Sequence, residues 1–367
     1  MTDRSTKNTL LLALCSFMLV FDPTQCHLFP LSVNNASEGV NDMITKCATH
    51  AILFFALAAG VQIMPQASIA QTKLRASYAG TTGYHLPIWV QKDEKLDKKY
   101  GLDMELLLIG GGAKVIQALI GGDLQLTHSG ASTVARAGIA GADLVIISTA
   151  VNHITWKVVT RKDIKVPVDL LGKKLAITAR GGSSELGLQL AFKHWGLDFS
   201  KLTILNLGPT PNRILALREG VVDATVLSYP EIMMTTQMGY PVLADLRQFA
   251  EMTDTSVVVG RPTLEKQRPL LKRFLQGYVE AIALLKRQPE TAYRALSHYT
   301  GNKDRSALEQ TYRFYADSMT DIPRTQSTGW RNLIAIFGKS EKEMARLLDM
   351  TLLDELEREG FFDRIGK

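Results

Sequence analysis

The chain is poor in cysteine, and it has none after position 47. Its three cysteines, Cys15, Cys26 and Cys47, all lie near the start of a 367-residue sequence. The remainder can form no disulfide, no thiolate-ligated metal site and no cysteine nucleophile. A chain without thiols suits an oxidising compartment.

Several enzyme signatures are also missing. The sequence has no Gly-x-Ser-x-Gly motif, no glycine-rich loop ending in Gly-Lys-Ser/Thr and no Gly-x-Gly-x-x-Gly. The histidines after residue 70 lack the spacing of metal ligands; they are His85, His128, His153, His194 and His298. We therefore predict no enzymatic activity, no cofactor and no metal.

Clustered basic charge is absent as well. The formal net charge is +6, but Lys and Arg are scattered in short pairs such as Lys98-Lys99. Nucleic-acid binding usually needs a concentrated basic stripe, so we predict no such partner. Hydrophobic residues at 46% and charged residues at 21% are typical of a globular protein.

Residues 43–70 have the pattern of a signal peptide. Lys46 supplies the positive region, residues 51–61 are apolar, and Ser68-Ile69-Ala70 permits cleavage before Gln71. The apolar run is too short to span a bilayer. A buried core helix is the alternative for this run. We predict export to the periplasm.

Residues 1–42 precede this signal and contain a second apolar run over 10–21. We interpret them as a mis-assigned extension, with Met43 as the true start. A two-segment membrane anchor is the alternative interpretation. In that case the N-terminus would stay on the protein instead of being removed.

The later sequence repeats itself. Tyr100-Gly101-Leu102-Asp103 returns as Trp195-Gly196-Leu197-Asp198, and Ile116-x-Ala118-Leu119-x-x-Gly122 returns as Ile214-x-Ala216-Leu217-x-x-Gly220. The offsets, 95 and 98 residues, are nearly equal. Such a repeat predicts two similar α/β lobes, and the cleft between two lobes can hold a small molecule.

Strand-like and helix-like segments alternate in both copies, which predicts an α/β fold with a mostly parallel sheet flanked by helices in each lobe. We assign 71–152 to the first part of lobe 1 and 153–258 to lobe 2. Residues 259–367 return to lobe 1 and add C-terminal helices. Helices are expected over 84–99 and 340–358, among others.

Ligands of open α/β sheets bind beyond the carboxyl ends of the strands, where helix N-termini offer free N–H groups. Glycine and small hydroxyl residues occupy these places here, although they could also be turns, helix N-caps or core residues. The candidate ligand-binding residues are Thr81, Thr82, Gly83, Tyr84, Gly111, Gly112, Ser129, Gly130, Ser132, Ser183, Ser184, Glu185, Tyr229 and Glu231.

Three further polar residues have two interpretations. Arg180 and Arg213 could clamp an anion, but we favour solvated surface positions for both. His128 stands beside the Ser129 loop and could contact ligand, but a structural role is favoured.

Residues 74–260 resemble the periplasmic substrate-binding proteins of ABC transporters for nitrate, sulfonates and taurine, a superfamily shared with the thiamine-pyrimidine precursor synthase. The resemblance rests on the doubled Ala-Leu-x-x-Gly and on three further segments, Tyr100-Gly101-Leu102-Asp103-Met104-Glu105, Asp169-Leu170-Leu171-Gly172-Lys173-Lys174 and Tyr229-Pro230-Glu231. Gln125 departs from the repeat, because its counterpart is Asp223.

The resemblance implies a two-lobed periplasmic-binding-protein fold of type II that closes on its ligand, and it adds Asn152 to the candidate site. It implies a monomer that delivers a small ligand, sulfonate- or carboxylate-like, to an ABC permease and ATPase. The alternatives are a precursor-synthase-like enzyme and a ligand-sensing receptor subunit. The resemblance implies a cysteine-rich motif for the synthase, and this chain has no cysteine after the predicted signal peptide, which disfavours the enzyme alternative.

Overall fold

The computed structural model describes residues 71–110, 112–249 and 251–366. The predicted extension 1–42 and signal peptide 43–70 lie outside these residues. Within the described ranges, no helix combines the length and the apolar character that crossing a bilayer requires. The described residues belong to one compact unit.

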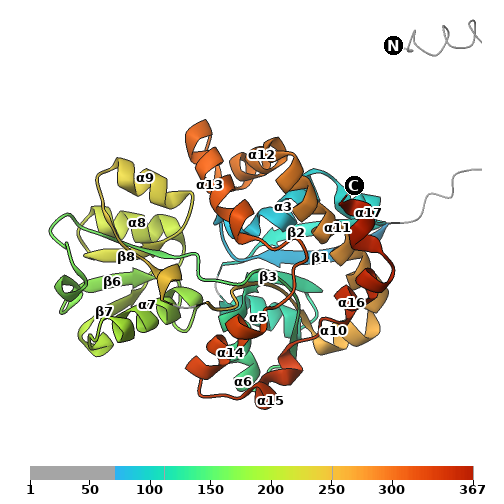
Figure 1. Cartoon of the computed structure of the whole chain (residues 1–367), viewed down its shortest axis with the longest axis horizontal. Coiled ribbons are helices and arrows are strands. Elements are labelled where there is room, and N and C mark those ends of the chain that lie inside the picture. Colours follow the sequence, from blue (N-terminus) through green and yellow to red (C-terminus); the bar gives the residue numbers. More distant parts are fainter. Residues whose placement is uncertain (1–70, 111, 250, 367) are drawn as a thin grey trace, which may run out of the picture. The chain divides into compact units, whose positions relative to one another are not determined.

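Two five-stranded sheets form the frame of this unit (Figure 1). The first sheet has the order β2-β1-β3-β10-β4 and the second β7-β6-β8-β5-β9. In each sheet one strand, β10 or β5, runs antiparallel to both neighbours. The strands are β1 (Thr72–Tyr78), β2 (Leu102–Leu108), β3 (Leu126–Gly130), β4 (Leu144–Val151), β5 (Lys157–Thr160), β6 (Lys174–Ile177), β7 (Thr203–Asn206), β8 (Ala224–Leu227), β9 (Val242–Asp245) and β10 (Thr255–Gly260).

The sequence repeat corresponds to a structural one. The first three strands of each sheet take the same relative places, β2-β1-β3 and β7-β6-β8. The paired glycines of the repeat have left-handed backbones, with φ of 71° at Gly101, 67° at Gly196, 81° at Gly122 and 70° at Gly220. Glycine takes this conformation without strain and so ends the helix before the next strand. The α/β two-lobed prediction is confirmed.

Two crossing segments connect the sheets. Residues 152–156 lead from β4 to β5, and residues 246–254 lead from β9 back to β10. The predicted lobe boundary at 258 therefore falls inside β10, which pairs with β3 and β4 of the first sheet. Thr255 and Ser256 are polar, yet they are buried at the start of this interior strand, so hydropathy alone did not reveal them.

Helices cover both sheets, and the helix predicted over 84–99 is interrupted. Lys95 has φ of 56° and separates α3 (Leu86–Asp93) from α4 (Leu96–Lys99), which lets Leu96 point into the core. The helices that begin beyond strand ends are α5 (Gly112–Ile120), α6 (Ala131–Ile139), α7 (Ser183–His194), α8 (Thr210–Arg218) and α9 (Glu231–Gln237).

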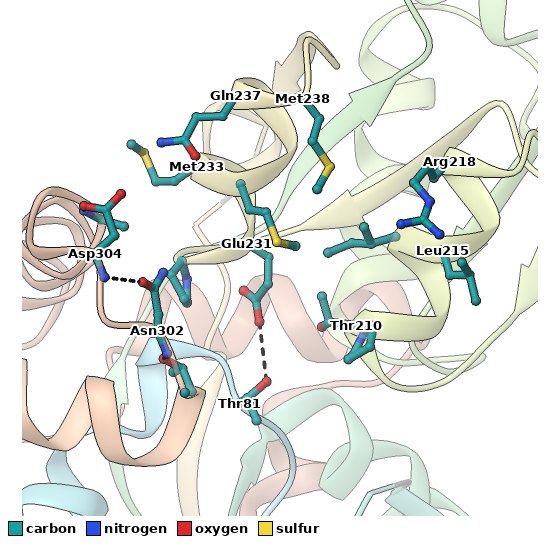
Figure 2. A pocket seen from close by; sticks show the side chains of 17 residues that line it. Thr81, Thr210, Leu215, Arg218, Glu231, Met233, Gln237, Met238, Asn302 and Asp304 are labelled. Atoms are coloured by element: carbon teal, nitrogen blue, oxygen red, sulfur yellow. Dashed lines mark hydrogen bonds between the residues drawn. The ribbon is translucent and has the colours of Figure 1, made fainter.

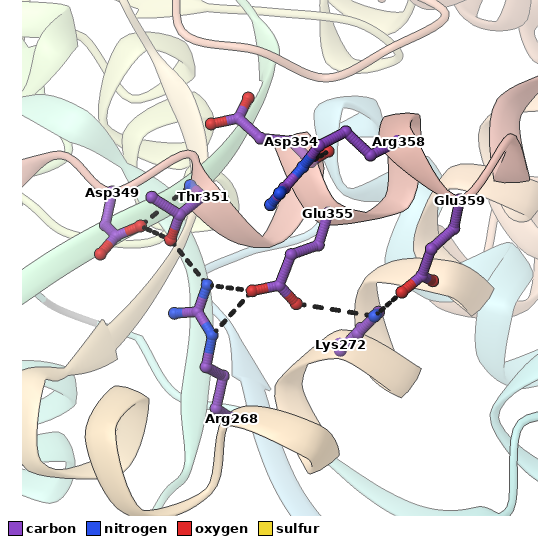
Figure 3. A network of polar contacts seen from close by, with 8 residues as sticks. All are labelled: Arg268, Lys272, Asp349, Thr351, Asp354, Glu355, Arg358 and Glu359. Carbon is purple, nitrogen blue, oxygen red and sulfur yellow. Dashed lines mark hydrogen bonds and ion pairs between the residues drawn. The ribbon is translucent and has the colours of Figure 1, made fainter.

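The C-terminal helices pack on the first sheet's side of the unit. The predicted helix 340–358 is divided, because residues 345–350 leave α-helical geometry. Buried leucines hold α16 against α11, and Arg268 and Lys272 pair with Glu355 across this contact at 2.6 and 3.5 Å (Figure 3). The helices are α10 (Arg261–Lys266), α11 (Arg268–Arg287), α12 (Pro289–Thr300), α13 (Arg305–Ser318), α14 (Ser327–Ile336), α15 (Glu341–Met344), α16 (Thr351–Arg358) and α17 (Phe361–Ile365).

Candidate functional site

Loops of both lobes meet beside the return crossing. Gly130 ends β3 and precedes α6, and a Cβ on it would lie 3.3 Å from Asp254 Oδ1. The same point lies 3.8 Å from Ser132 Oγ and 4.0 Å from Ser183 Oγ. Ser132 belongs to α6 of the first lobe and Ser183 to α7 of the second. The structure therefore brings three predicted residues together around one carboxyl group that was not predicted.

Asp254 is the most unusual group at this meeting point. Its side chain is 2% exposed, and its Oδ2 atom has no hydrogen-bond partner among the described residues. Burial raises the pKa of Asp254 to about 7, although a hydrogen bond from Ser183 acts in the opposite direction. The Oγ atoms of Ser132 and Ser184 are buried and also lack partners in the described chain. Several polar groups at two helix N-termini are thus available to a ligand.

Trp156 and Arg213 form the wall behind Ser183. Trp156 Nε1 donates a 2.8 Å hydrogen bond to Ser183 Oγ, and the guanidinium of Arg213 lies 5.7 Å from the centre of the Trp156 ring. Arg213 is 1% exposed and donates to the Gly208 carbonyl at 3.1 Å, to Thr210 Oγ1 at 2.8 Å and to the Val226 carbonyl. Burial lowers its pKa to about 10.

The surface position predicted for Arg213 is therefore wrong. The first turn of α8 turns this side chain toward β8, where backbone carbonyls receive its N–H groups. Arg180, by contrast, is more than half exposed, as predicted.

A second cluster surrounds Glu231 at the start of α9. Thr81 Oγ1 donates to Glu231 Oε1 at 3.4 Å, while Oε2 is buried without a partner among the described residues. Burial raises the pKa of Glu231 to about 7, against the lowering effects of Arg213 and Thr81. A cavity of about 680 Å³ opens here between α8, α9 and the connection from α12 to α13 (Figure 2). This volume suits an organic molecule better than a small inorganic ion.

Tyr84 lies within electrostatic range of both clusters. Burial raises the pKa of Tyr84, and the charges of Asp254 and Glu231 raise it further. The residue is partly exposed and follows Gly83, whose N–H donates to the Tyr229 carbonyl across the lobes at 3.3 Å. This contact brings the candidate loops 80–84 and 229–231 together.

His128 has the structural role that the sequence favoured. The Ala79 N–H donates to His85 Nε2 at 3.2 Å, so the His85 proton is on Nδ1, which lies 2.7 Å from His128 Nδ1. His128 Nε2 in turn lies 2.6 Å from the Tyr278 hydroxyl. Burial lowers the pKa of His128 to about 3, so this chain of hydrogen bonds is neutral.

Other candidate residues are engaged within the protein. Asn152 donates to the Arg324 carbonyl and accepts from the Gln326 N–H, each at 2.9 Å, which fastens the C-terminal segment to the end of β4. Glu185 accepts from Arg180 at 2.8 Å and from the Gly181 N–H. These contacts occupy polar atoms that a ligand would otherwise use.

The remaining candidates provide little evidence about ligand contact. Thr82 and Ser129 are 4% exposed. Gly112 begins α5, and Gly111 lies outside the described residues.

Sequence reasoning missed Asp254 and Trp156 for a topological reason. The candidate residues were taken from loops that follow strands, whereas these two residues precede β10 and β5. Both strands run antiparallel to their neighbours, so their first residues reach the same sheet edge as the ends of the others. The polar Asp254-Thr255-Ser256 before an apolar run was an available signal. No group of three or more metal-ligating side chains is found in the described ranges.

Solved structures with the same fold come from several sources. A protein from Bordetella bronchiseptica RB50 matches with a TM-score of 0.69 and 16% identity, over 79% of this chain and 98% of that chain. The periplasmic aliphatic sulphonate binding protein SsuA from Escherichia coli matches with a TM-score of 0.61 and 22% identity, over 75% and 92%. The periplasmic-binding-protein fold is thus confirmed.

Sequence comparison adds a curated relative and a family. The taurine-binding periplasmic protein of Escherichia coli (strain K12) is 26% identical over 196 residues, which cover 52% of this chain and 60% of that protein. The sequence model of the family described as NMT1/THI5 like matches residues 82–292, more than half of the chain. The resemblance drawn from the sequence is confirmed, and the chain belongs to the NMT1/THI5-like family.

Proposed function

We propose that the protein is the periplasmic solute-binding component of an ABC importer. It captures a small organic molecule between its lobes and releases it unchanged to a membrane permease. The observation that carries this proposal is a group of buried polar atoms from both lobes that have no hydrogen-bond partner among the described residues, namely Asp254 Oδ2, Ser132 Oγ and Ser184 Oγ. A ligand can satisfy them together only when both lobes contact it.

The ligand carries an anionic group, sulfonate- or carboxylate-like, in this proposal. The first turns of α6 and α7 present N–H groups and serine hydroxyls to the meeting point of the lobes. Ser183 is oriented by Trp156, so one of these hydroxyls is already positioned. The curated relative is named for taurine, which bears a sulfonate, and this supports the same class.

Binding works through a change in the balance of open and closed forms. Two crossing segments, 152–156 and 246–254, connect the lobes, and a pair of connections permits hinge motion. Ligand contacts that need both lobes favour the closed form. The permease then receives a monomeric, closed complex, and the ATPase drives release.

Ligand titration tests the proposal directly. Purified protein is titrated calorimetrically with alkanesulfonates, taurine, nitrate and aromatic carboxylates. We expect one organic anion to bind with a Kd of roughly micromolar or better, which is about −8 kcal/mol. Failure of every compound to bind, or chemical turnover of one, would contradict the proposal.

The N-terminus of the protein from cells tests its location. Mass spectrometry should find a start at Gln71, after removal of the predicted signal peptide. An intact Met43 would instead favour the enzyme alternative.

A further inference from the structure

The cavity beside Glu231 has features that the anionic group does not use. Its floor is acidic, because Glu231 Oε2 is buried there without a partner among the described residues. Figure 2 shows the Glu231 carboxylate in the middle of the lining, turned toward Thr81. An anion placed against this carboxylate would be repelled, so this part of the cavity is matched to a donor or a cation.

The positive charges nearby are already engaged. Arg213 is buried and directed at the Gly208 and Val226 carbonyls and at Thr210. Among the described residues that line the cavity, Arg218 carries the positive charge, and it pairs with Glu219 at 3.1 Å. Neither arginine forms an ion pair with Glu231 in the described chain. Thr81 offers Glu231 a single long hydrogen bond. The carboxylate can therefore accept from a ligand.

The wall above Glu231 is apolar and exposed. Met234 is 40% exposed, Met238 is 47% exposed and Leu215 of α8 is 49% exposed, and all three line the cavity. Methionine side chains adapt to apolar surfaces of varied shape. We call Met233, Met234 and Met238 the methionine wall. Figure 2 shows Met233 and Met238 on the same side of the cavity as the helix that Glu231 begins, and Met234 lines the same cavity. A group that is both cationic and apolar would satisfy floor and wall together.

We propose that the cavity beside Glu231 is a subsite for a substituted ammonium, with the nitrogen at Glu231 and its aliphatic or aromatic substituent on the methionine wall. The ligand then has two poles, an anionic group at the α6 and α7 N-termini and a substituted ammonium in the cavity. This inference rests on the proposed function, since it concerns another part of the same ligand.

Three related sulfonates test the inference. N-cyclohexyltaurine carries the anion, the protonated nitrogen and an apolar ring. Cyclohexylpropanesulfonate has the same length and ring with a methylene in place of the nitrogen, and taurine keeps the nitrogen without the ring. At about neutral pH, we expect N-cyclohexyltaurine to bind at least about tenfold more tightly than either partial compound, as charged hydrogen bonds and buried rings contribute.

Variants assign the effect to named residues. Glu231→Gln keeps the size of the side chain. It should raise the Kd for N-cyclohexyltaurine at least about tenfold and leave the Kd for cyclohexylpropanesulfonate within about twofold of its original value. Glu265→Gln is the matched control, because it removes an exposed carboxylate of α10 outside the cavity lining. Met234→Gln should reduce the preference for N-cyclohexyltaurine over taurine, whereas Val221→Thr, at an exposed apolar position outside the lining, should not.

The outcomes separate this inference from the proposed function. If the unmodified protein binds cyclohexylpropanesulfonate as tightly as N-cyclohexyltaurine or more tightly, the ammonium subsite is overturned, while the proposed anion site is unaffected. This comparison needs no variant, so a folding defect in Glu231→Gln does not affect it. Equal loss of both cyclohexyl compounds in Glu231→Gln also overturns the inference. If none of the three sulfonates binds, the sulfonate class fails, and the inference fails with it.

Discussion

Asp254 gives the protein a specific dependence of stability on pH. Burial raises its folded-state pKa to about 7 from the ordinary aspartate pKa of 3.8. Below about pH 4 the carboxyl is protonated in both folded and unfolded chains and has no differential effect. Between about pH 4 and 7 the unfolded chain ionises while the folded chain keeps its proton, so stability falls as pH rises. Above about pH 7 the loss is constant.

The size of this effect follows from the shift. A difference of roughly three pKa units corresponds to about 4 kcal/mol of lost stability. Asp254→Asn keeps the shape of the side chain and cannot ionise. Relative to the unmodified protein, we expect this variant to gain stability from near zero at about pH 4 to about 4 kcal/mol at about pH 8, measured by urea unfolding.

A second aspartate provides a control of opposite sign. The N–H groups of Lys165 and Val166 lower the pKa of Asp169, which is exposed. Asp169→Asn should therefore lose stability at neutral pH and approach the unmodified protein as pH falls through the folded pKa of this group. A pH-independent difference for Asp254→Asn, or a variant that becomes less stable as pH rises, would refute the argument for Asp254.

The same carboxyl should couple ligand binding to protons. An ionised Asp254 would repel an anionic group at Ser132 and Ser183, whereas the protonated acid can donate to it. Within the proposed function, the affinity for an anion should fall by up to about tenfold per pH unit above about pH 7. Calorimetric titration should show this slope for the unmodified protein and a flat profile for Asp254→Asn.

Three further predictions concern contacts around the site. Gly83→Ala should lower stability by about 1–3 kcal/mol in urea unfolding, because its Cβ would lie 2.6 Å from the buried Tyr315 ring; Gly80→Ala, with no neighbouring atom within 4 Å, should be near neutral. Trp156→Phe should cost about 1 kcal/mol of stability and weaken ligand binding, since Ser183 loses the donor that orients it; unchanged affinity would contradict this role. Glu185→Gln should reduce the melting temperature but leave the ligand Kd within about twofold, because its carboxylate serves Arg180 and Gly181; a large loss of affinity would show ligand contact instead.

The frame of the protein was accessible from sequence because its signals are local. A strand buried on both faces reads as a nearly unbroken apolar run, as at Leu144–Val151, where every residue is buried. A glycine that ends a helix is marked by its own backbone freedom, as at Gly101 and Gly196. The two-lobed order follows from such signals. Lys95 gave no such signal, because a non-glycine residue rarely takes a left-handed backbone.

The site was less accessible because burial of its polar groups depends on chain crossings. Nothing in the neighbourhood of Asp254 indicates that β3 and β4 will lie on either side of β10. Arg213 is followed by Ile214 and Leu215 in an ordinary amphipathic context, and the carbonyls that receive its N–H groups belong to Gly208 and Val226. A buried charge is recognised from the partners brought to it, and those partners are distant in sequence or in another element.

Glu185 and Glu231 show most directly why partners decide function. Both stand in the first turn of a helix that follows a strand of the second sheet, so the sequence treats them alike. In the structure the Glu185 carboxylate is satisfied by Arg180 and the Gly181 N–H within its own loop. Glu231 reaches only Thr81 from the other lobe and keeps one buried oxygen without a partner in the described chain. A carboxylate satisfied by its own loop stabilises that loop, whereas one that lacks a partner can accept from a ligand. The two equivalent positions therefore separate into a structural group and, in our proposal, the group that selects the ligand.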